Sequence, residues 1–91
     1  TIWVANSVFK NNAVNNYALN IAYGTTAHGR ITIQNNEFTG NNNGLYISNN
    51  VQDSTVIIAN NTVSGNYASG MYINTVRCDV VLYNGVFTGG G

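Results

Sequence analysis

Residues 31–41 read ITIQNNEFTGN, and the same phrase returns three more times along the chain. The other copies read TIWVANSVFKN at residues 1–11, TVIIANNTVSGN at residues 55–66 and DVVLYNGVFTG at residues 79–89. Their equivalent apolar anchors, Ile2, Ile31, Val56 and Val80, lie 29, 25 and 24 residues apart. A period of this length predicts a stacked repeat architecture, in which each repeat covers the hydrophobic face of the next one.

Apolar residues alternate with other residues inside each copy, as at Ile31 and Ile33. Alternation with period two indicates a β-strand with one buried face. A second short strand follows, with Phe38 inward and Glu37 outward. A third strand reads GLYI at residues 44–47, with related copies near residues 18 and 70. The residues expected to face inward are Ile2, Val4, Phe9, Leu19, Ile21, Ile31, Ile33, Phe38, Leu45, Ile47, Val56, Ile58, Val63, Met71, Ile73, Val80, Leu82 and Phe87.

Three short strands per repeat, joined by polar corners, predict that equivalent strands of successive coils pair in parallel, about 4.8 Å apart. The expected fold is therefore all-β, a right-handed parallel β-helix or solenoid, with about three and a half coils of three strands each. The coils are expected at approximately residues 1–29, 30–54, 55–78 and 79–91 of one β-helix segment.

Two adjacent positions end the first strand of each copy. The first position is Asn in every copy, at Asn6, Asn35, Asn60 and Asn84. Continued alternation would turn these four inward, which predicts an internal ladder of hydrogen-bonded amides. The second position holds Ser7, Asn36, Asn61 and Gly85. Because Asn and Gly enter the left-handed backbone region most readily, this second position predicts the tight corner.

The repeat as a whole resembles a known family. The pattern Val/Ile-x-Ile-x-Asn-Asn-x-Phe-x-Gly-Asn, followed by Gly-Leu/Met-Tyr-Ile, is similar to the parallel β-helix repeats of the pectin-lyase-like superfamily. That superfamily includes polysaccharide lyases, glycoside hydrolases, periplasmic copper-accessory proteins, phage tailspikes and surface adhesins. The resemblance covers nearly the whole chain and implies the fold, but it leaves the activity open because one fold carries many functions.

The composition narrows the class of partner and the compartment. The net charge is +0, which argues against nucleic acid and against an anionic membrane surface. No apolar run approaches the length of a membrane span. The single Cys78 excludes an internal disulfide. Few charges, no Pro and abundant Asn, Gly, Ser and Thr favour an extracellular or cell-surface β-solenoid.

The two ends of the repeat array look like interior coils, since no polar capping repeat is visible. Two interpretations stay open at this point. The chain is an excerpt of a longer solenoid, or its open ends stack on copies of itself. The expected partner is accordingly the chain itself, or flanking coils, in end-to-end stacking.

Two outward columns are candidate binding surfaces. Tyr46 and Tyr72 should stack on the third strand near Asn20 and Asn74, an arrangement that suits a polysaccharide. The alternative is that the rings only stabilise the sheet face. On the first strand, the outward residues Trp3, Ile57 and Val81 suggest a partner surface. The alternative there is a covering segment.

No catalytic, metal or cofactor site is expected in these residues. Hydrolysis of glycosides normally needs two carboxyl groups about 5–10 Å apart, and the few acidic residues are dispersed. A column of His28, Asp53 and Arg77 is more simply read as alternating charge that avoids like-charge stacking. Cys78 lacks the surroundings of a reactive thiol. Asn60-Asn61-Thr62 is a glycosylation sequon, but it should stay unmodified if Asn60 faces inward.

These observations favour a non-catalytic structural β-solenoid that acts as a rigid scaffold or fibre, with glycan contact at the tyrosine face. The rival hypothesis is a fragment of a polysaccharide lyase or glycoside hydrolase whose catalytic coils lie outside these 91 residues. The flanking sequence would separate the two hypotheses.

Overall fold

The computed structural model describes residues 1–12, 17–23, 29–49, 54–75 and 78–88, which contain eleven β-strands. The strands form three sheets, and every pair of neighbouring strands is parallel. The first sheet contains β1 (Ile2–Ala5), β4 (Arg30–Gln34), β7 (Ser54–Ala59) and β10 (Cys78–Tyr83). The second contains β2 (Val8–Lys10), β5 (Glu37–Thr39), β8 (Thr62–Ser64) and β11 (Val86–Thr88). The third contains β3 (Tyr17–Tyr23), β6 (Asn43–Asn49) and β9 (Ser69–Thr75).

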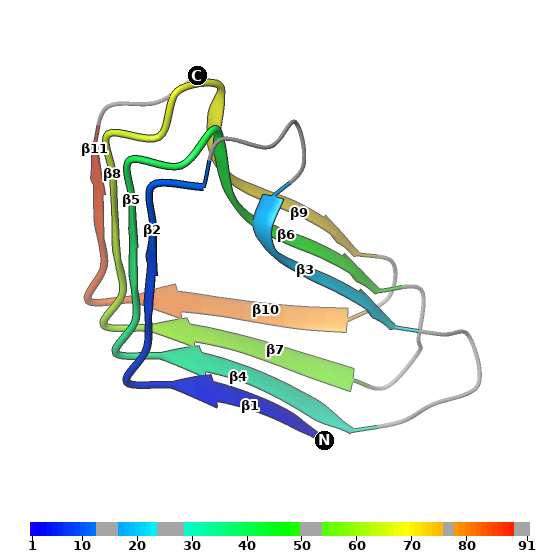
Figure 1. Cartoon of the computed structure of the whole chain (residues 1–91). Helices are drawn as coiled ribbons and strands as arrows, with labels where there is room; N and C mark the ends of the chain where they lie inside the picture. The colour runs from blue at the N-terminus through cyan, green and yellow to red at the C-terminus, as the bar shows by residue number, and fades with distance from the viewer. Residues whose placement is uncertain (13–16, 24–28, 50–53, 76–77, 89–91) are drawn as a thin grey trace.

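The three sheets are the three sides of a coil (Figure 1). The chain passes along the first sheet, turns into the second and returns along the third, and the next coil then starts behind the previous one. In Figure 1 the chain turns clockwise as the coils recede from the viewer, so the winding is right-handed. The predicted fold, a right-handed parallel β-helix with three strands per coil, is confirmed.

The register between coils follows the repeat in the sequence. Ile31 lies opposite Ile2 on one side and Val56 on the other, and Val80 lies opposite Val56. Phe38 lies between Phe9 and Val63 in the second sheet. Equivalent residues therefore stack on residues of the same kind, which lets each coil accept the next without a change in shape.

The core fills the interior of the second and third coils and includes Ile21 of the first coil. It consists of Ile21, Ile31, Ile33, Phe38, Leu45, Ile47, Val56, Ile58 and Val63, all from the predicted inward set. Six further members of that set, Ile2, Val4, Phe9, Leu19, Met71 and Ile73, are partly buried against it. The last three, Val80, Leu82 and Phe87, are 40%, 47% and 40% exposed, because no described coil covers the fourth one.

The predicted amide ladder at Asn6, Asn35, Asn60 and Asn84 is wrong. All four residues are exposed, and their φ angles are 55°, 57°, 56° and 51°, in the left-handed region. A left-handed residue does not continue the in-and-out alternation of a strand, so the corner turns these side chains outward and the following residue inward. The first of the two adjacent positions is therefore the corner and the second is the ladder position, the reverse of the prediction.

Asn36 and Asn61, one position further along, form the ladder. The Asn36 N–H donates to Asn61 Oδ1 (3.0 Å), and Ser7 N–H donates to Asn36 Oδ1 (3.0 Å). The side-chain amides also donate backwards, Asn36 Nδ2 to the Val4 carbonyl (3.0 Å) and Asn61 Nδ2 to the Ile33 carbonyl (2.9 Å). Each Asn thus links its own coil to the preceding coil by hydrogen bonds. The ladder ends at Gly85, which has no side chain.

A second ladder at the next corner follows the same rule. Here the left-handed residues are Asn11, Gly40 and Gly65, and the residues after them are Asn12, Asn41 and Asn66. Asn41 Nδ2 donates to the Phe9 carbonyl (2.8 Å) and Asn66 Nδ2 to the Phe38 carbonyl (3.0 Å). Asn41 Oδ1 accepts the N–H of Asn12 (3.1 Å). Sequence reasoning missed this ladder, although the recurring Gly-Asn that ends two of the copies pointed to it.

Candidate binding surfaces

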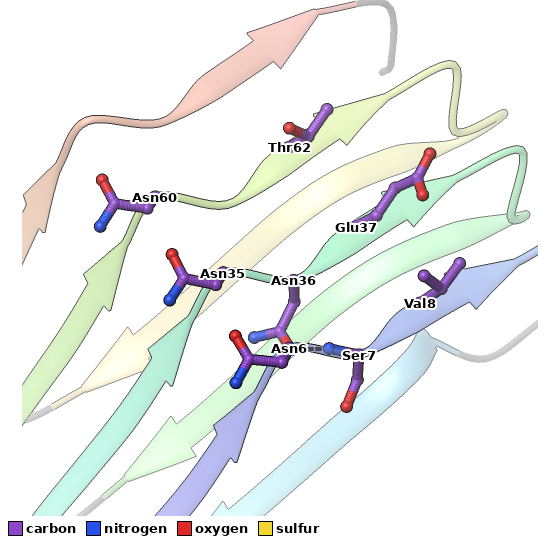
Figure 2. Close-up of a pocket in the computed structure, with 8 residues that line it drawn as sticks. All are labelled: Asn6, Ser7, Val8, Asn35, Asn36, Glu37, Asn60 and Thr62. Atoms are coloured by element: carbon purple, nitrogen blue, oxygen red, sulfur yellow. Dashed lines mark hydrogen bonds between the residues drawn. The ribbon is translucent and has the colours of Figure 1, made fainter.

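The exposed asparagines of the first corner line a shallow groove on the outside of the coils. Asn6, Asn35 and Asn60 lie one above the other and point away from the core, beside Val8, Glu37 and Thr62 of the second sheet (Figure 2). The groove has a volume of about 500 Å³. We call this feature the corner groove. It offers a row of amide donors and acceptors with one carboxylate, whose oxygen accepts a bond from Thr39 Oγ1 (3.2 Å).

A row of aromatic rings crosses the outer face of the third sheet. The rings of Tyr46 and Tyr72 are stacked, with centroids 5.3 Å apart and planes 11° apart. The Tyr17 ring adds a third member, 5.0 Å from the Tyr46 ring and tilted by 36°. We call Tyr17, Tyr46 and Tyr72 the tyrosine row. The rings partly cover one another, so the row presents ring edges and hydroxyl groups along its length, and Tyr72 at its end is the most exposed member.

Sequence reasoning found two members of the tyrosine row and missed the third. Tyr17 pairs with Asn43 in the strand register, and simple alternation with Leu19 and Ile21 assigns it to the inner face. Its ring instead contacts the outward Tyr46. The position of Tyr17 as the first residue of β3 was the only indication, because a strand end is free to depart from the alternation.

The predicted polar neighbours of the row are in place. Asn20 lies in register with Tyr46, and Tyr46 with Tyr72. Asn74 pairs with Ser48, two residues further along the strands. Both Asn20 and Asn74 are exposed, so amide groups lie along the same sheet face as the rings.

The apolar column of the first sheet is less continuous than its sequence indicates. Trp3, Thr32, Ile57 and Val81 are in register. Trp3 is 64% and Val81 44% exposed, whereas Ile57 is half-buried and Thr32 is buried. The column therefore has two exposed apolar ends around a covered middle. Its role as a partner surface stays a prediction.

The charged residues do not gather into a site within the described part of the chain. His28, Asp53 and Arg77, the predicted column, lie outside the described residues. Glu37 belongs to the second coil and Asp79 to the fourth, in different sheets. Among the described residues, no group of three or more His, Cys, Asp or Glu side chains could hold a metal ion. None of the described residues forms a helix long and apolar enough to cross a membrane.

Three parallel sheets wound into successive coils, with stacked aliphatic residues and amide ladders inside, define a parallel β-helix protein. A family model described as periplasmic copper-binding protein (NosD) matches residues 2–90. The chain belongs to this family. No curated protein and no solved structure matches it. The predicted kinship with β-helix repeat proteins is confirmed at the level of this β-helical family, and the finer assignment to the pectin-lyase-like superfamily stays a prediction.

Proposed function

We propose that these residues form a rigid, non-catalytic segment of an exported β-solenoid, which contacts polysaccharide through the tyrosine row. The observation that carries the proposal is the row of three neighbouring rings, two of them stacked, on one outer sheet face. The family description, which places its members in the periplasm, supports export from the cytoplasm to the periplasm or the cell surface.

Rigidity comes from the two amide ladders. Each buried Asn makes several hydrogen bonds to the neighbouring coil, and an unbonded polar group at the same place would cost about 1–3 kcal/mol. The outer faces are therefore held at fixed spacing by the coil repeat. A surface with fixed spacing suits a polymer with its own regular repeat, because little order has to be created on binding.

The chemistry of the tyrosine row matches a sugar. A pyranose ring presents C–H groups on its faces, which pack on aromatic rings, and hydroxyl groups at its edge, which bond to amides and phenols. Tyr72 is 49% exposed, so a ring face or edge is free for contact. The exposed amides of Asn20 and Asn74 lie on the same face for the hydroxyl groups.

The test is binding to a panel of polysaccharides that includes cellulose, pectin and alginate fragments. We expect the Tyr46→Ala, Tyr72→Ala double variant to lower the affinity for polysaccharide by about tenfold or more, since covering an aromatic side chain contributes on the order of 1 kcal/mol or more. Tyr67→Ala is the matched control, because Tyr67 is 87% exposed and lies outside the stack. Binding that survives the double change would refute the proposal.

A carbohydrate-active enzyme is the second hypothesis, with its catalytic coils outside these residues. The acidic residues of the described coils, Glu37 and Asp79, are two coils apart and offer no pair for acid–base chemistry. If a pectin, alginate or glycan panel shows turnover that Asp79→Ala abolishes, the non-catalytic proposal fails.

Copper binding, the property in the family description, is not assigned to this segment. Copper takes thiolate, thioether and imidazole ligands. Met71 packs against the core, and the described residues hold no cluster of His, Cys, Asp or Glu. His28 lies outside the described residues. The described residues thus do not fit a copper ion, and no part of the proposed function depends on one.

A further inference from the structure

The conformation of the corner changes the expectation for the glycosylation sequon Asn60-Asn61-Thr62. The expectation that it stays unmodified depended on an inward Asn60. Asn60 is instead exposed, with φ 56°, and lines the outer corner groove together with Thr62 (Figure 2). The physical reason to exclude modification is therefore removed.

Of the three sequon residues, Asn61 faces the inside of the coil, and Asn60 and Thr62 face the outside. Asn61 is 2% exposed, and its amide donates to Ile33 O (2.9 Å), so this Asn is occupied by the ladder. The carboxamide of Asn60 has no hydrogen-bond partner among the described residues, and it points into solvent. Thr62 is half-buried on the outer side of β8. A substituent on the Asn60 amide therefore displaces no contact of the fold.

We propose that Asn60 is an acceptor site for N-linked glycosylation. The donor is a lipid-diphosphate-linked oligosaccharide, and the catalyst is an oligosaccharyltransferase of the exporting cell. The Asn60 amide nitrogen attacks the anomeric carbon of the first sugar and forms the C–N bond. The bond from that carbon to the diphosphate oxygen breaks, the lipid diphosphate leaves with the electron pair, and the amide loses one proton.

The glycan has to be transferred before the third coil forms its hydrogen bonds with the neighbouring coils. In the fold, the Asn60 N–H donates to Tyr83 O (3.2 Å) and the Thr62 N–H donates to Asn36 O (2.9 Å), so the sequon backbone is fixed between two neighbouring coils. A transferase needs this backbone extended and accessible. After folding, the glycan projects from the corner groove, and the ladder beneath it is unchanged.

The structure provides a matched control for the acceptor. Asn35 occupies the same corner of the preceding coil, is also exposed and has φ 57°. The residue two positions after Asn35 is Glu37, whereas the residue two positions after Asn60 is Thr62. Glu37 and Thr62 lie in register. The two corners thus have the same geometry, but only the Asn60 corner is followed by the hydroxyl group that a sequon requires.

The experiment is secretion of the whole chain from a host with an oligosaccharyltransferase that modifies Asn-x-Thr sites, followed by intact-mass and peptide mass spectrometry. We expect one glycan, located on Asn60. Asn60→Gln and Thr62→Val should each lose it, and Asn35→Gln should keep it. Glu37→Thr should add a second glycan, on Asn35.

The proposal is overturned by an unmodified chain when a known glycoprotein secreted from the same cells is modified. It is also overturned if a glycan persists in both Asn60→Gln and Thr62→Val, or if Glu37→Thr gains a glycan while Asn60 stays bare. The inference does not rest on the polysaccharide contact, because none of the variants touches the tyrosine row. Polysaccharide binding by the unmodified chain can be measured separately.

Discussion

At the scale of the residue, one rule describes the first two corners of the described coils. A left-handed residue turns the chain, and the residue after it points into the core, as at Asn35 and Asn36 or at Gly40 and Asn41. Asn suits both places for different reasons. Its short polar side chain tolerates the left-handed region, and its amide carries both a donor and an acceptor for the ladder.

This rule predicts a large effect on stability at one of two adjacent asparagines and a small effect at the other. Asn61→Ala removes the acceptor of the buried Asn36 N–H and the donor to Ile33 O. We expect it to lower the free energy of unfolding by about 3 kcal/mol, because unsatisfied buried polar groups remain. Asn60→Gly should change it by less than about 0.5 kcal/mol, since Gly accepts the positive φ.

Urea unfolding of both variants, followed by circular dichroism, measures the difference. Equal losses in the two variants would contradict the assignment of Asn61 to the ladder and of Asn60 to the corner.

At the scale of the element, the third sheet depends on a close approach between β6 and β9. A Cβ atom added at Gly44 would lie 2.2 Å from the Gly70 carbonyl oxygen and 3.3 Å from Asn66 Nδ2. Both neighbours are fixed, one as backbone and the other as a ladder amide. Only a residue without a side chain lets the two strands pair here.

Gly44→Ala should therefore destabilise the protein by about 2–3 kcal/mol, because the strands must separate to admit the methyl group. Gly70→Ala is the control, since its Cβ would meet only Val63 Cγ1, at 3.1 Å, and a side chain can shift. Thermal unfolding compares the two. A Gly70→Ala variant less stable than Gly44→Ala would show that the close approach lies elsewhere.

At the scale of the whole molecule, the fourth coil has an apolar layer that no other described coil covers. Val80, Leu82 and Phe87 are each at least 40% exposed, and the register of every coil step places such residues opposite counterparts of the same type. On a second copy these counterparts are Ile2, Val4 and Phe9, which are only partly buried. We propose that this layer is covered by a coil, either from flanking sequence or from another copy.

If the 91 residues are produced alone, we expect end-to-end oligomers that grow with concentration, because a head-to-tail contact does not close. Light scattering at micromolar concentration measures their mass. Leu82→Lys should reduce them by placing a charge in the junction, while Asn20→Lys, on the outer face of the third sheet, should leave them unchanged. A monodisperse wild-type monomer would contradict self-stacking.

The sequence by itself determined the β-helix, the three strands per coil and the register between coils. The physical reason is that stacked coils require like residues at like positions, so the interior repeats visibly, as at Ile31, Val56 and Val80. The Tyr46–Tyr72 stack followed from the same periodicity. These properties depend only on spacing, and spacing can be read directly from a chain.

Only the tertiary structure decided which residue of each Asn pair faces the core and that Tyr17 joins the tyrosine row. In an Asn-Asn pair, either residue could form the corner while the other faces the core. The residue types alone therefore do not determine which of the two joins the ladder. The choice is made by the point where strand pairing ends and φ becomes positive, at Asn35 and Asn60, which a side-chain pattern does not record. That one-residue shift buries the Asn61 amide in the ladder and turns Asn60 out to solvent.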